Sequence, residues 1–351
     1  MMSDTLIFAI ESSCDETAAS IIKNGKEVLS NVVATQIDVH KDFGGVIPEV
    51  ASRIHVENIS MVICEALKEA NVSLEDVDAI AVTQGPGLVG SLHVGVQAAK
   101  TLAYAYHKPL VPVHHIAGHI FANRLVDELH FPLLALVVSG GHTELVYMKD
   151  EFSFEILGTT QDDAIGEAYD KVSRVMGMGY PGGPVIDRLA KEGKPLYKLP
   201  SPKTENELDF SFSGLKSGVL QFIDRCNRKN ETYEPKHLAC SFQETALHIL
   251  LTKLEKAIQL KKPKQVVLAG GVAANSRLRE LVSELMETKY SEIHYIIPPL
   301  SCCTDNAAMI GVAGTYAYLH GVRGEMDLSA RASMDLEQYG IDNNSDFHCI
   351  K

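Results

Sequence analysis

The sequence predicts a two-lobed α/β protein built by duplication of one unit. The chain has 351 residues, which is more than one compact core usually holds, so two lobes are expected. The same succession of short apolar runs and polar turns occurs at the N-terminus and again from residue 133. Hydrophobic residues make up 46% and charged residues 22%, an ordinary globular balance that excludes a disordered or fibrous protein.

Each lobe opens with a strand meander, because polar turns separate short apolar runs there. The runs expected to be strands are 5–10, 18–22 and 28–33 in the first lobe, and 133–138, 144–148 and 152–157 in the second. Further strands are expected at 79–83 and 266–269, and residues 110–113 form another short apolar run. Apolar residues at helical spacing predict helices at 54–70, 92–106, 164–176, 242–260 and 306–319.

These elements suggest the domain boundaries. We expect a first lobe over residues 1–129, completed by a C-terminal helix at about 306–320. The second lobe would occupy 130–305, and residues 321–351 are polar and expected to form an irregular tail. In duplicated folds of this kind, the equivalent turns of the two lobes line a central cleft.

Charge and composition exclude several classes of protein. The formal net charge is −13, Trp is absent and aromatic residues are only 7%, so neither an autonomous nucleic-acid binder nor a base-stacking platform is expected. A local basic patch or a basic partner would have to contact a nucleic acid instead. Seven cysteines without a CxxC pair indicate a reducing compartment. No signal peptide or membrane span is expected, since the uncharged stretch 79–99 contains four glycines, a proline and several polar side chains. We expect a cytoplasmic protein.

The segment Gly85-Pro-Gly87-Leu-Val-Gly90 matches a GxGxxG pattern after an expected strand. A dinucleotide-binding turn also needs an acidic residue about 20 positions further on to hold the ribose. No Asp or Glu occurs between Gly90 and Asp127. The segment is therefore interpreted as a tight loop, and dinucleotide binding is not expected.

His115 and His119 form an HxxxH pattern that follows an apolar run. In a helix they would lie on one face, at the spacing that lets two imidazoles bind one cation. The metalloprotease pattern needs a Glu after the first His, and this chain has Ile116 there. A carboxylate elsewhere must complete the site. Asp305 is a good candidate, and Cys302 and Cys303 are rivals for the same role.

Three glycine-rich turns, 138–142, 180–184 and 269–275, favour a nucleotide site. Glycine lets the backbone approach a ligand closely, and amides at a helix N-terminus suit phosphate. Asp170 and Asp187 flank the middle turn and could accept ribose hydroxyls. A charged first hairpin at Asp15 and Glu16 adds to this interpretation.

Taken together, these motifs resemble the TsaD family. The resemblance covers about residues 6–331, and the motifs come in the order of the family. His142-Thr143 after Ser-Gly-Gly and the segment 44–49 are similar to the bacterial branch. The segments that carry the resemblance are 11–17, 40–55, 85–88, 115–119, 138–143, 210–216, 269–275 and 303–306.

The resemblance implies an actin-like ATPase (ASKHA) fold with two lobes around a cleft. It also implies transfer of a threonylcarbamoyl group from threonylcarbamoyl-adenylate to N6 of adenosine 37 (t6A formation), with release of AMP. The tRNAs concerned read codons beginning with A. The implied partners are TsaB, a paralogue without the metal motif, and the ATPase TsaE.

The resemblance also assigns site residues. His115, His119 and Asp305 would bind iron(II), although zinc suits the same donor atoms. We add the hypothesis that Asp15 takes the amine proton or holds the phosphate region. The residues implied to line the adenylate site are Val137, Val138, Ser139, Gly140, Gly141, Asp170, Gly183, Asp187 and Asn275.

Two other functions are weighed against this interpretation. A metal-dependent peptidase acting on glycoproteins would use HxxxH, but the general base is missing at Ile116. A non-catalytic ATP-binding scaffold would use the same fold, but it has no need of a His-His-Asp set. Cleavage of a glycoprotein would reveal the first, and bound metal without transferase activity would favour the second.

Overall fold

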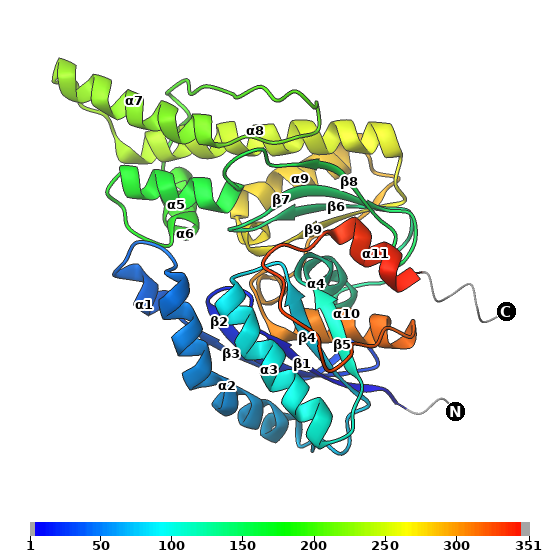
Figure 1. Ribbon diagram of the computed structural model, residues 1–351. Helices are drawn as coiled ribbons and strands as arrows, with labels where there is room; N and C mark the ends of the chain where they lie inside the picture. The colour runs from blue at the N-terminus through cyan, green and yellow to red at the C-terminus, as the bar shows by residue number, and fades with distance from the viewer. Residues whose placement is uncertain (1–3, 345–351) are drawn as a thin grey trace. The chain divides into compact units, whose positions relative to one another are not determined.

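The computed structural model describes residues 4–344, and Figure 1 shows the arrangement of its elements. The chain forms two compact units. Within the described range, unit 1 comprises the residues up to Leu129, Asp150–Phe154 and the residues from Thr304 on, whereas unit 2 comprises His130–Lys149 and Glu155–Cys303. Among the helices of residues 4–344, none is long and apolar enough to cross a membrane.

The sheet of unit 1 is mixed, with strand order β3-β2-β1-β4-β5. β1 pairs antiparallel with β2 and parallel with β4, and β5 is parallel to β4. The central strands are buried along nearly their whole length, as expected for a sheet with both faces covered. The strands are β1 (Leu6–Glu11), β2 (Glu16–Lys23), β3 (Glu27–Thr35), β4 (Ala79–Gly85) and β5 (Leu110–His114).

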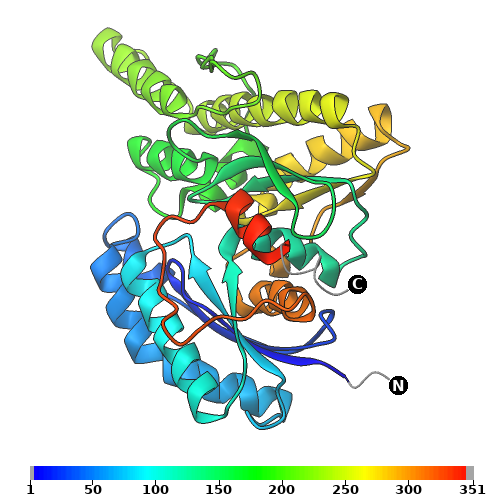
Figure 2. The same cartoon turned by 45° about the vertical axis from the view of Figure 1, so that its right-hand side comes forward.

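Helices cover both faces of this sheet. α2 (Pro48–Ala70) and α3 (Val89–Ala105) pack on one face, where apolar side chains of both helices meet those of β1 and β4. α10 (Ala307–Leu319), apolar on all sides, packs on the other face (Figure 2). Its Gly311 and Gly314 permit this close approach, because a Cβ atom at either position would lie 2.4 Å from a sheet side chain.

Short helices complete unit 1. α1 (Ile37–Lys41) precedes α2, and α4 (His115–Phe121) follows β5 directly and leads into η1 (Ala122–Leu125). The expectation of an irregular C-terminal tail is wrong for residues 336–344, which form α11 (Leu336–Asn344). Leu336 and Tyr339 are buried, and a Cβ atom on Gly340 would meet the carbonyl of Phe152 at 2.5 Å. Such a brief apolar pair gives too weak a periodic signal to predict a helix.

His114 joins the C-terminal segment to α4. Its Nδ1 accepts a hydrogen bond from the Ile116 amide at 3.1 Å, and its Nε2 lies 3.1 Å from the carbonyl of Met334. Burial, supported by the nearby His115 charge, lowers the pKa of His114 to about 4. The ring therefore stays neutral in the folded protein, donating from Nε2.

We expect this buried imidazole to destabilise the protein in acid. Between pH 6.5 and pH 4 the unfolded chain binds a proton at His114 that the folded chain does not, so stability falls as the pH falls. The loss between pH 7 and pH 5 is about 2 kcal/mol. His114→Asn keeps an acceptor for the helix cap and removes the titration. Denaturant unfolding of both proteins, after chelation of metals, gives the free energy of unfolding at each pH. This free energy should depend less on pH in His114→Asn than in the parent, and the same pH dependence in both would refute the role of His114.

Unit 2 repeats the sheet of unit 1 strand for strand. Its order is β10-β9-β6-β7-β8, with β7 antiparallel to β6, β9 parallel to β6 and β10 parallel to β9. Read in chain order, β6 to β10 occupy the places of β1 to β5, which confirms the predicted duplication. The strands are β6 (Leu133–Val138), β7 (Thr143–Met148), β8 (Phe154–Thr159), β9 (Gln265–Ala269) and β10 (His294–Ile296).

One continuous apolar core joins the unit 2 sheet to its helices. In Figure 1, α8 runs along the sheet, with α7 beside it. Neither α6 nor α7 is expected from the sequence, since α6 begins with two glycines and the first turns of α7 contain Gly214 and Gly218, which weaken a helical pattern. The helices are α5 (Ile165–Val175), α6 (Gly182–Lys191), α7 (Ser213–Lys229), α8 (Pro235–Lys261) and α9 (Ser276–Lys289), with the short turns η2 (Gly271–Ala274) and η3 (Leu300–Cys302).

Candidate functional site

The two histidines of the HxxxH pattern lie one turn apart on α4, and both are buried. Asp305 comes from the segment that precedes α10 in the same unit. Its Oδ1 lies 3.1 Å from Nε2 of His119 and 3.7 Å from Nε2 of His115. One ligand atom from each of the three residues lies within 4.8 Å of the other two, so the group could hold a metal ion.

The chemistry of this group fits a divalent metal. Within residues 4–344, Nδ1 and Nε2 of the buried His119 make no hydrogen bond. A buried ring without hydrogen bonds is costly unless another partner, such as a cation, receives its lone pair. Two imidazoles and one carboxylate are the donors of many iron(II) sites, and zinc accepts the same set.

Of the three candidates for the third ligand, the geometry favours Asp305. The thiol of Cys303 faces the carbonyl oxygens of Pro298 and Pro299, and burial raises its pKa to about 11. Burial also raises the pKa of Cys302. Among the described residues, neither thiol belongs to the group of ligand atoms that His115, His119 and Asp305 form.

His115 is held between two carboxylates. Burial lowers its pKa, but the charges of Asp305 and Glu11 outweigh burial and raise the pKa to about 9. Only a neutral imidazole binds a metal, so a metal ion that enters this group has to displace a proton.

Asp15 lies, buried, in the turn between β1 and β2. Its backbone carbonyl accepts a hydrogen bond from the amide of Gln36 at 3.0 Å. His55 of α2 braces the same turn, since its Nδ1 lies 2.7 Å from the Thr17 hydroxyl and its Nε2 lies 2.9 Å from the Cys14 carbonyl. The turn that carries Asp15 is therefore tied to α2.

Negative charge is concentrated at this turn. Burial, followed by the charges of Asp15 and Asp305, raises the pKa of Glu16 well above its ordinary value. The same influences raise the pKa of the Cys14 thiol, which stays protonated. A cation would be stabilised by these surroundings.

The loop after β4 is tight, as the sequence predicts, and packs against the turn after β1. Its Gly87 lies against the turn after β1, where a Cβ atom would meet the Ser13 carbonyl at 2.6 Å. The same carbonyl accepts a hydrogen bond from the Leu88 amide at 2.7 Å. This loop thus supports the turn between β1 and β2.

In unit 2, the glycine-rich turns pack against one another. A Cβ atom on Gly166, at the start of α5, would lie 2.7 Å from the carbonyl of Ser139. A Cβ atom on Gly182 would lie 2.4 Å from the Tyr169 carbonyl, and a Cβ atom on Gly270 would lie 2.4 Å from the Val138 carbonyl. Glycine is required at these contacts, because any side chain would clash with the facing backbone. The close packing of the turns brings the residues predicted to bind the adenylate together.

Other glycines of the same turns face open space. No atom lies within 4 Å of a Cβ placed on Gly140, Gly141, Gly183 or Gly271. The sequence interpretation did not single out Gly271, although it lies in the third glycine-rich turn. Exposed backbone amides without side chains leave room for a ligand to approach.

The polar residues of this group are held in place by neighbours. Asp170 accepts a hydrogen bond from the Gly182 amide at 2.6 Å, and Asp187 accepts one from the Ser276 hydroxyl at 2.9 Å. Asn275 caps α9 through the Leu278 amide and donates to Oε1 of Gln243 at 2.9 Å. The sequence gives no sign of Gln243, because it lies within the long apolar helix α8.

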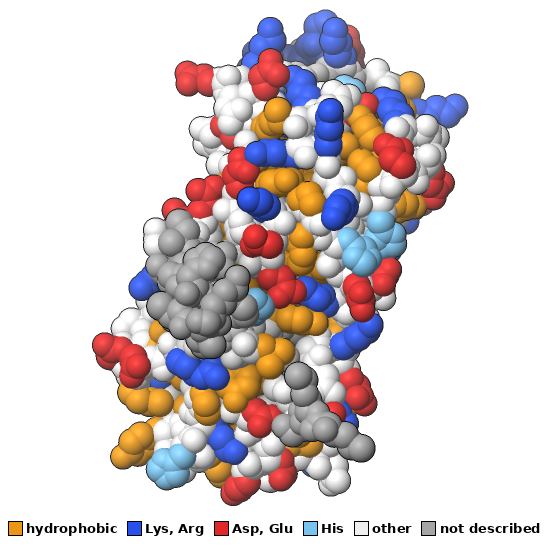
Figure 3. Space-filling view, turned by 90° about the vertical axis from the view of Figure 1, so that its right-hand side faces the viewer, with side chains coloured by type: hydrophobic (Ala, Val, Ile, Leu, Met, Phe, Trp, Pro, Cys, Tyr) orange, Lys and Arg blue, Asp and Glu red, His pale blue; other side chains and the backbone are white. Residues whose placement is uncertain are grey.

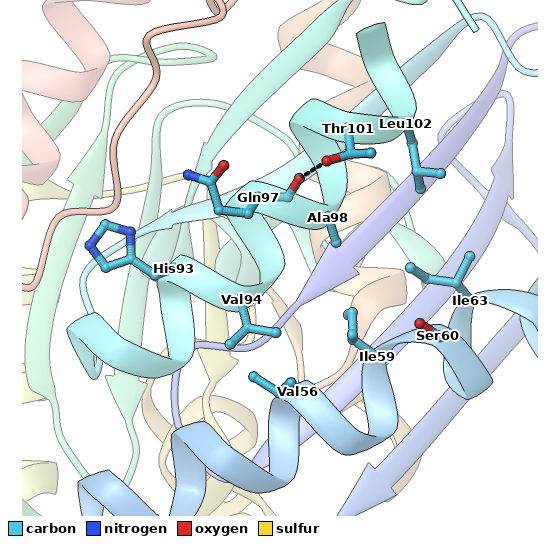
Figure 4. Close-up of a pocket in the computed structure, with 10 residues that line it drawn as sticks. All are labelled: Val56, Ile59, Ser60, Ile63, His93, Val94, Gln97, Ala98, Thr101 and Leu102. Carbon is cyan, nitrogen blue, oxygen red and sulfur yellow. Dashed lines mark hydrogen bonds between the residues drawn. The ribbon is translucent and has the colours of Figure 1, made fainter. Parts of the chain in front are cut away.

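A separate apolar groove of about 570 Å³ lies between α2 and α3 (Figure 4). The side chains of Val56, Ile59 and Val94 line it, and the hydroxyl of Thr101 is bonded within its own helix to the carbonyl of Gln97 at 2.8 Å. None of the predicted site residues lines this groove. It is not the candidate active site.

The molecular face shown in Figure 3 carries basic and acidic side chains interspersed with hydrophobic ones. The net charge of −13 is therefore not gathered into one acidic surface on that face. Mixed charge of this kind is typical of a protein surface in water.

The duplicated fold has solved counterparts. Component A of (R)-2-hydroxyglutaryl-CoA dehydratase from Acidaminococcus fermentans matches with a TM-score of 0.52 and 13% identity, over 89% of this chain and 98% of that one. The paired sheets and this likeness show that the chain has the actin-like (ASKHA) α/β fold.

Sequence comparison defines the family. The TsaD family, described as tRNA N6-adenosine threonylcarbamoyltransferase, matches residues 27–312. A tRNA N6-adenosine threonylcarbamoyltransferase of Bacillus anthracis is 57% identical over 96% of this chain and 98% of its own length. The enzyme of the same name from Staphylococcus carnosus is 55% identical over 97% of this chain and 99% of its own length. The chain belongs to the TsaD family.

Proposed function

We propose that this chain forms t6A in tRNA with a metal ion held by His115, His119 and Asp305. Its activity is that of a tRNA N6-adenosine threonylcarbamoyltransferase. The 55–57% identity to enzymes of that name, over nearly the whole chain, supports this activity. The buried His-His-Asp group supports the metal. Iron(II) is the metal we propose, with zinc as the alternative that the donors also accept.

The reaction joins a weak nucleophile to an activated acyl group. Threonylcarbamoyl-adenylate is a mixed anhydride, so its carbonyl carbon is the electrophile and AMP leaves when the adenine N6 attacks. Positioning and polarisation of the carbonyl must supply most of the rate enhancement. A bound divalent metal supplies Lewis-acid polarisation and a fixed point for the donor. His115, His119 and Asp305 would hold that metal on the rigid α4 and at the start of α10.

We infer that the glycine-rich turns of unit 2 bind the adenylate. Open space above Gly140, Gly141 and Gly183 gives a ligand access to their backbone amides. Asp170 and Asp187 are acceptors for ribose hydroxyls. The full set proposed is Val137, Val138, Ser139, Gly140, Gly141, Asp170, Gly183, Asp187 and Asn275.

Asp15 is proposed to take the proton that N6 loses during transfer. Asp15→Asn keeps the size of the side chain but cannot accept this proton, so we expect kcat to fall roughly 100-fold, a usual effect of removing a general base. The exposed Asp38→Asn on α1 removes the same charge elsewhere and should transfer normally. Single-turnover formation of t6A measures the rate. Full rate in Asp15→Asn would remove Asp15 from the reaction.

The partners are proposed from the family resemblance. With a net charge of −13, the chain is poorly suited to hold a polyanion alone, which supports assembly with TsaB and TsaE on tRNA. The tRNA substrate supports a cytoplasmic location.

A reconstitution tests these partners. The chain, TsaB, TsaE, ATP, threonylcarbamoyl-adenylate and unmodified tRNA with A37 are combined, and digested nucleosides are measured by mass spectrometry. We expect t6A from the full mixture and much less when TsaB or TsaE is omitted. An equal yield of t6A without TsaB and TsaE would contradict the proposed assembly. If the metal-loaded chain forms no t6A in the full mixture, the alternative of a non-catalytic ATP-binding scaffold would be favoured.

A further inference from the structure

Glu11 is a fully buried carboxylate at the end of β1, beside the metal group but outside it. The Thr83 hydroxyl donates a hydrogen bond to its Oε2 at 2.6 Å, and the Ser13 amide donates to its Oε1. The same Oε2 lies 3.3 Å from Nδ1 of His115. A buried carboxylate is costly unless it is hydrogen-bonded and its charge is balanced, so this arrangement needs an explanation.

The ring of His115 has two different sides. Nδ1 faces Glu11 and the Ser13 hydroxyl, which lies at 3.1 Å. Nε2 faces the side of Asp305, at 3.7 Å from Oδ1. If Nδ1 carries the proton and donates it toward Glu11, the lone pair of Nε2 points to where Asp305 and His119 converge.

We infer that Glu11 is a positioning residue that tunes the metal centre through His115. It accepts the Nδ1 proton, which fixes the tautomer and orientation of the ring, and it adds a second negative charge next to the ion. The inference rests on the proposed metal site. Ser13 can also orient the ring, but it is neutral and cannot balance charge.

The charge balance supports this role. Two neutral imidazoles and the Asp305 carboxylate leave one positive charge on a divalent cation, and the Glu11 carboxylate balances that charge. Loss of the Glu11 charge should therefore weaken binding of the ion.

The rival explanation is that Glu11 only holds the turn after β1, through Ser13 and Thr83. Glu11→Gln separates the two roles, because glutamine keeps the shape and can still bond both neighbours while the charge is lost. A purely structural role would change the melting temperature and leave metal affinity as it is.

The test measures binding of Zn²⁺ and Co²⁺ by competition with a chromophoric chelator, together with the visible absorption spectrum of bound Co²⁺. We expect Glu11→Gln to bind roughly 10–100-fold more weakly, the usual effect of losing an outer carboxylate, with an altered Co²⁺ spectrum. Thr83→Val keeps the charge but removes one donor, so a smaller loss is expected. Glu69→Gln, which removes an exposed charge of α2, should bind as the parent does.

The outcomes separate the inference from the site on which it depends. Unchanged affinity in Glu11→Gln, with affinity lost in His119→Ala, would overturn the role of Glu11 and leave the metal site standing. Unchanged affinity in both variants would overturn the metal site itself. If Glu11→Gln does not fold, Glu11→Asp keeps the charge but withdraws it from Nδ1, and affinity equal to that of the parent would then overturn the inference.

Discussion

His119→Ala is expected to lose its metal and to lower the rate of t6A formation at least about 100-fold, as removal of one group that stabilises transition-state charge commonly does. His119 is buried on α4, and its Nε2 lies 3.1 Å from Oδ1 of Asp305, the carboxylate of the same metal group. Alanine is a strong helix former, and α4 should persist. Elemental analysis gives the metal content, and mass spectrometry of digested tRNA gives the product.

The control for this variant is His93→Ala. His93 is exposed on α3, and its replacement removes an imidazole without touching the buried group. It should keep both metal and rate. A His119→Ala protein that has lost its metal but transfers at the parental rate would show that the metal takes no part in the reaction.

Two adjacent glycines of α6 are expected to behave in opposite ways. Gly183 faces open space, so Gly183→Val should leave the melting temperature nearly unchanged while its side chain occupies the proposed adenylate site. We expect KM for threonylcarbamoyl-adenylate to rise at least about tenfold, equivalent to 1.4 kcal/mol of lost binding. Gly182 lies against the backbone of Tyr169 and Asp170, so Gly182→Val should instead destabilise unit 2.

Thermal unfolding measures the melting temperatures of Gly182→Val and Gly183→Val, and initial rates at varied threonylcarbamoyl-adenylate concentration give their KM. Because both variants carry the same valine one residue apart, a shared effect on helix propensity cancels in the comparison. Parental KM in a stable Gly183→Val protein would mean that the adenylate does not bind at this turn.

Sequence patterns predicted the parts of the fold that have strong local signals. The buried strands β1, β4, β6 and β9 read as short apolar runs, and their repetition predicted the duplication. Residue spacing predicted that His115 and His119 would share one face if their segment were helical, and the structure shows that it forms α4. The glycines in α6 and α7 weakened the helical pattern of both segments. Their packing reasons lie elsewhere in the chain, since Gly182 lies against the backbone of Asp170 and Gly218 lies against the ring of Pro200.

The site was predicted less completely than the fold. Residue types alone left Asp305, Cys302 and Cys303 as candidates, and the family resemblance favoured Asp305. The structure supports that choice, because the thiol of Cys303 faces the Pro298 and Pro299 carbonyls. Glu11 was visible as a lone acidic residue ending an apolar strand, yet its role depends on His115, which is distant in sequence. A sequence pattern does not show which side of a histidine ring faces a neighbour.

The central claim is that t6A formation by this chain requires the metal held by His115, His119 and Asp305. The most direct measurement is single-turnover transfer from preformed threonylcarbamoyl-adenylate, in the complete assembly, by protein stripped with a chelator and then reloaded with Fe²⁺ or Zn²⁺. We predict that stripping abolishes transfer and that reloading restores it in the parent protein but not in His119→Ala. Undiminished transfer by fully stripped protein would contradict the account.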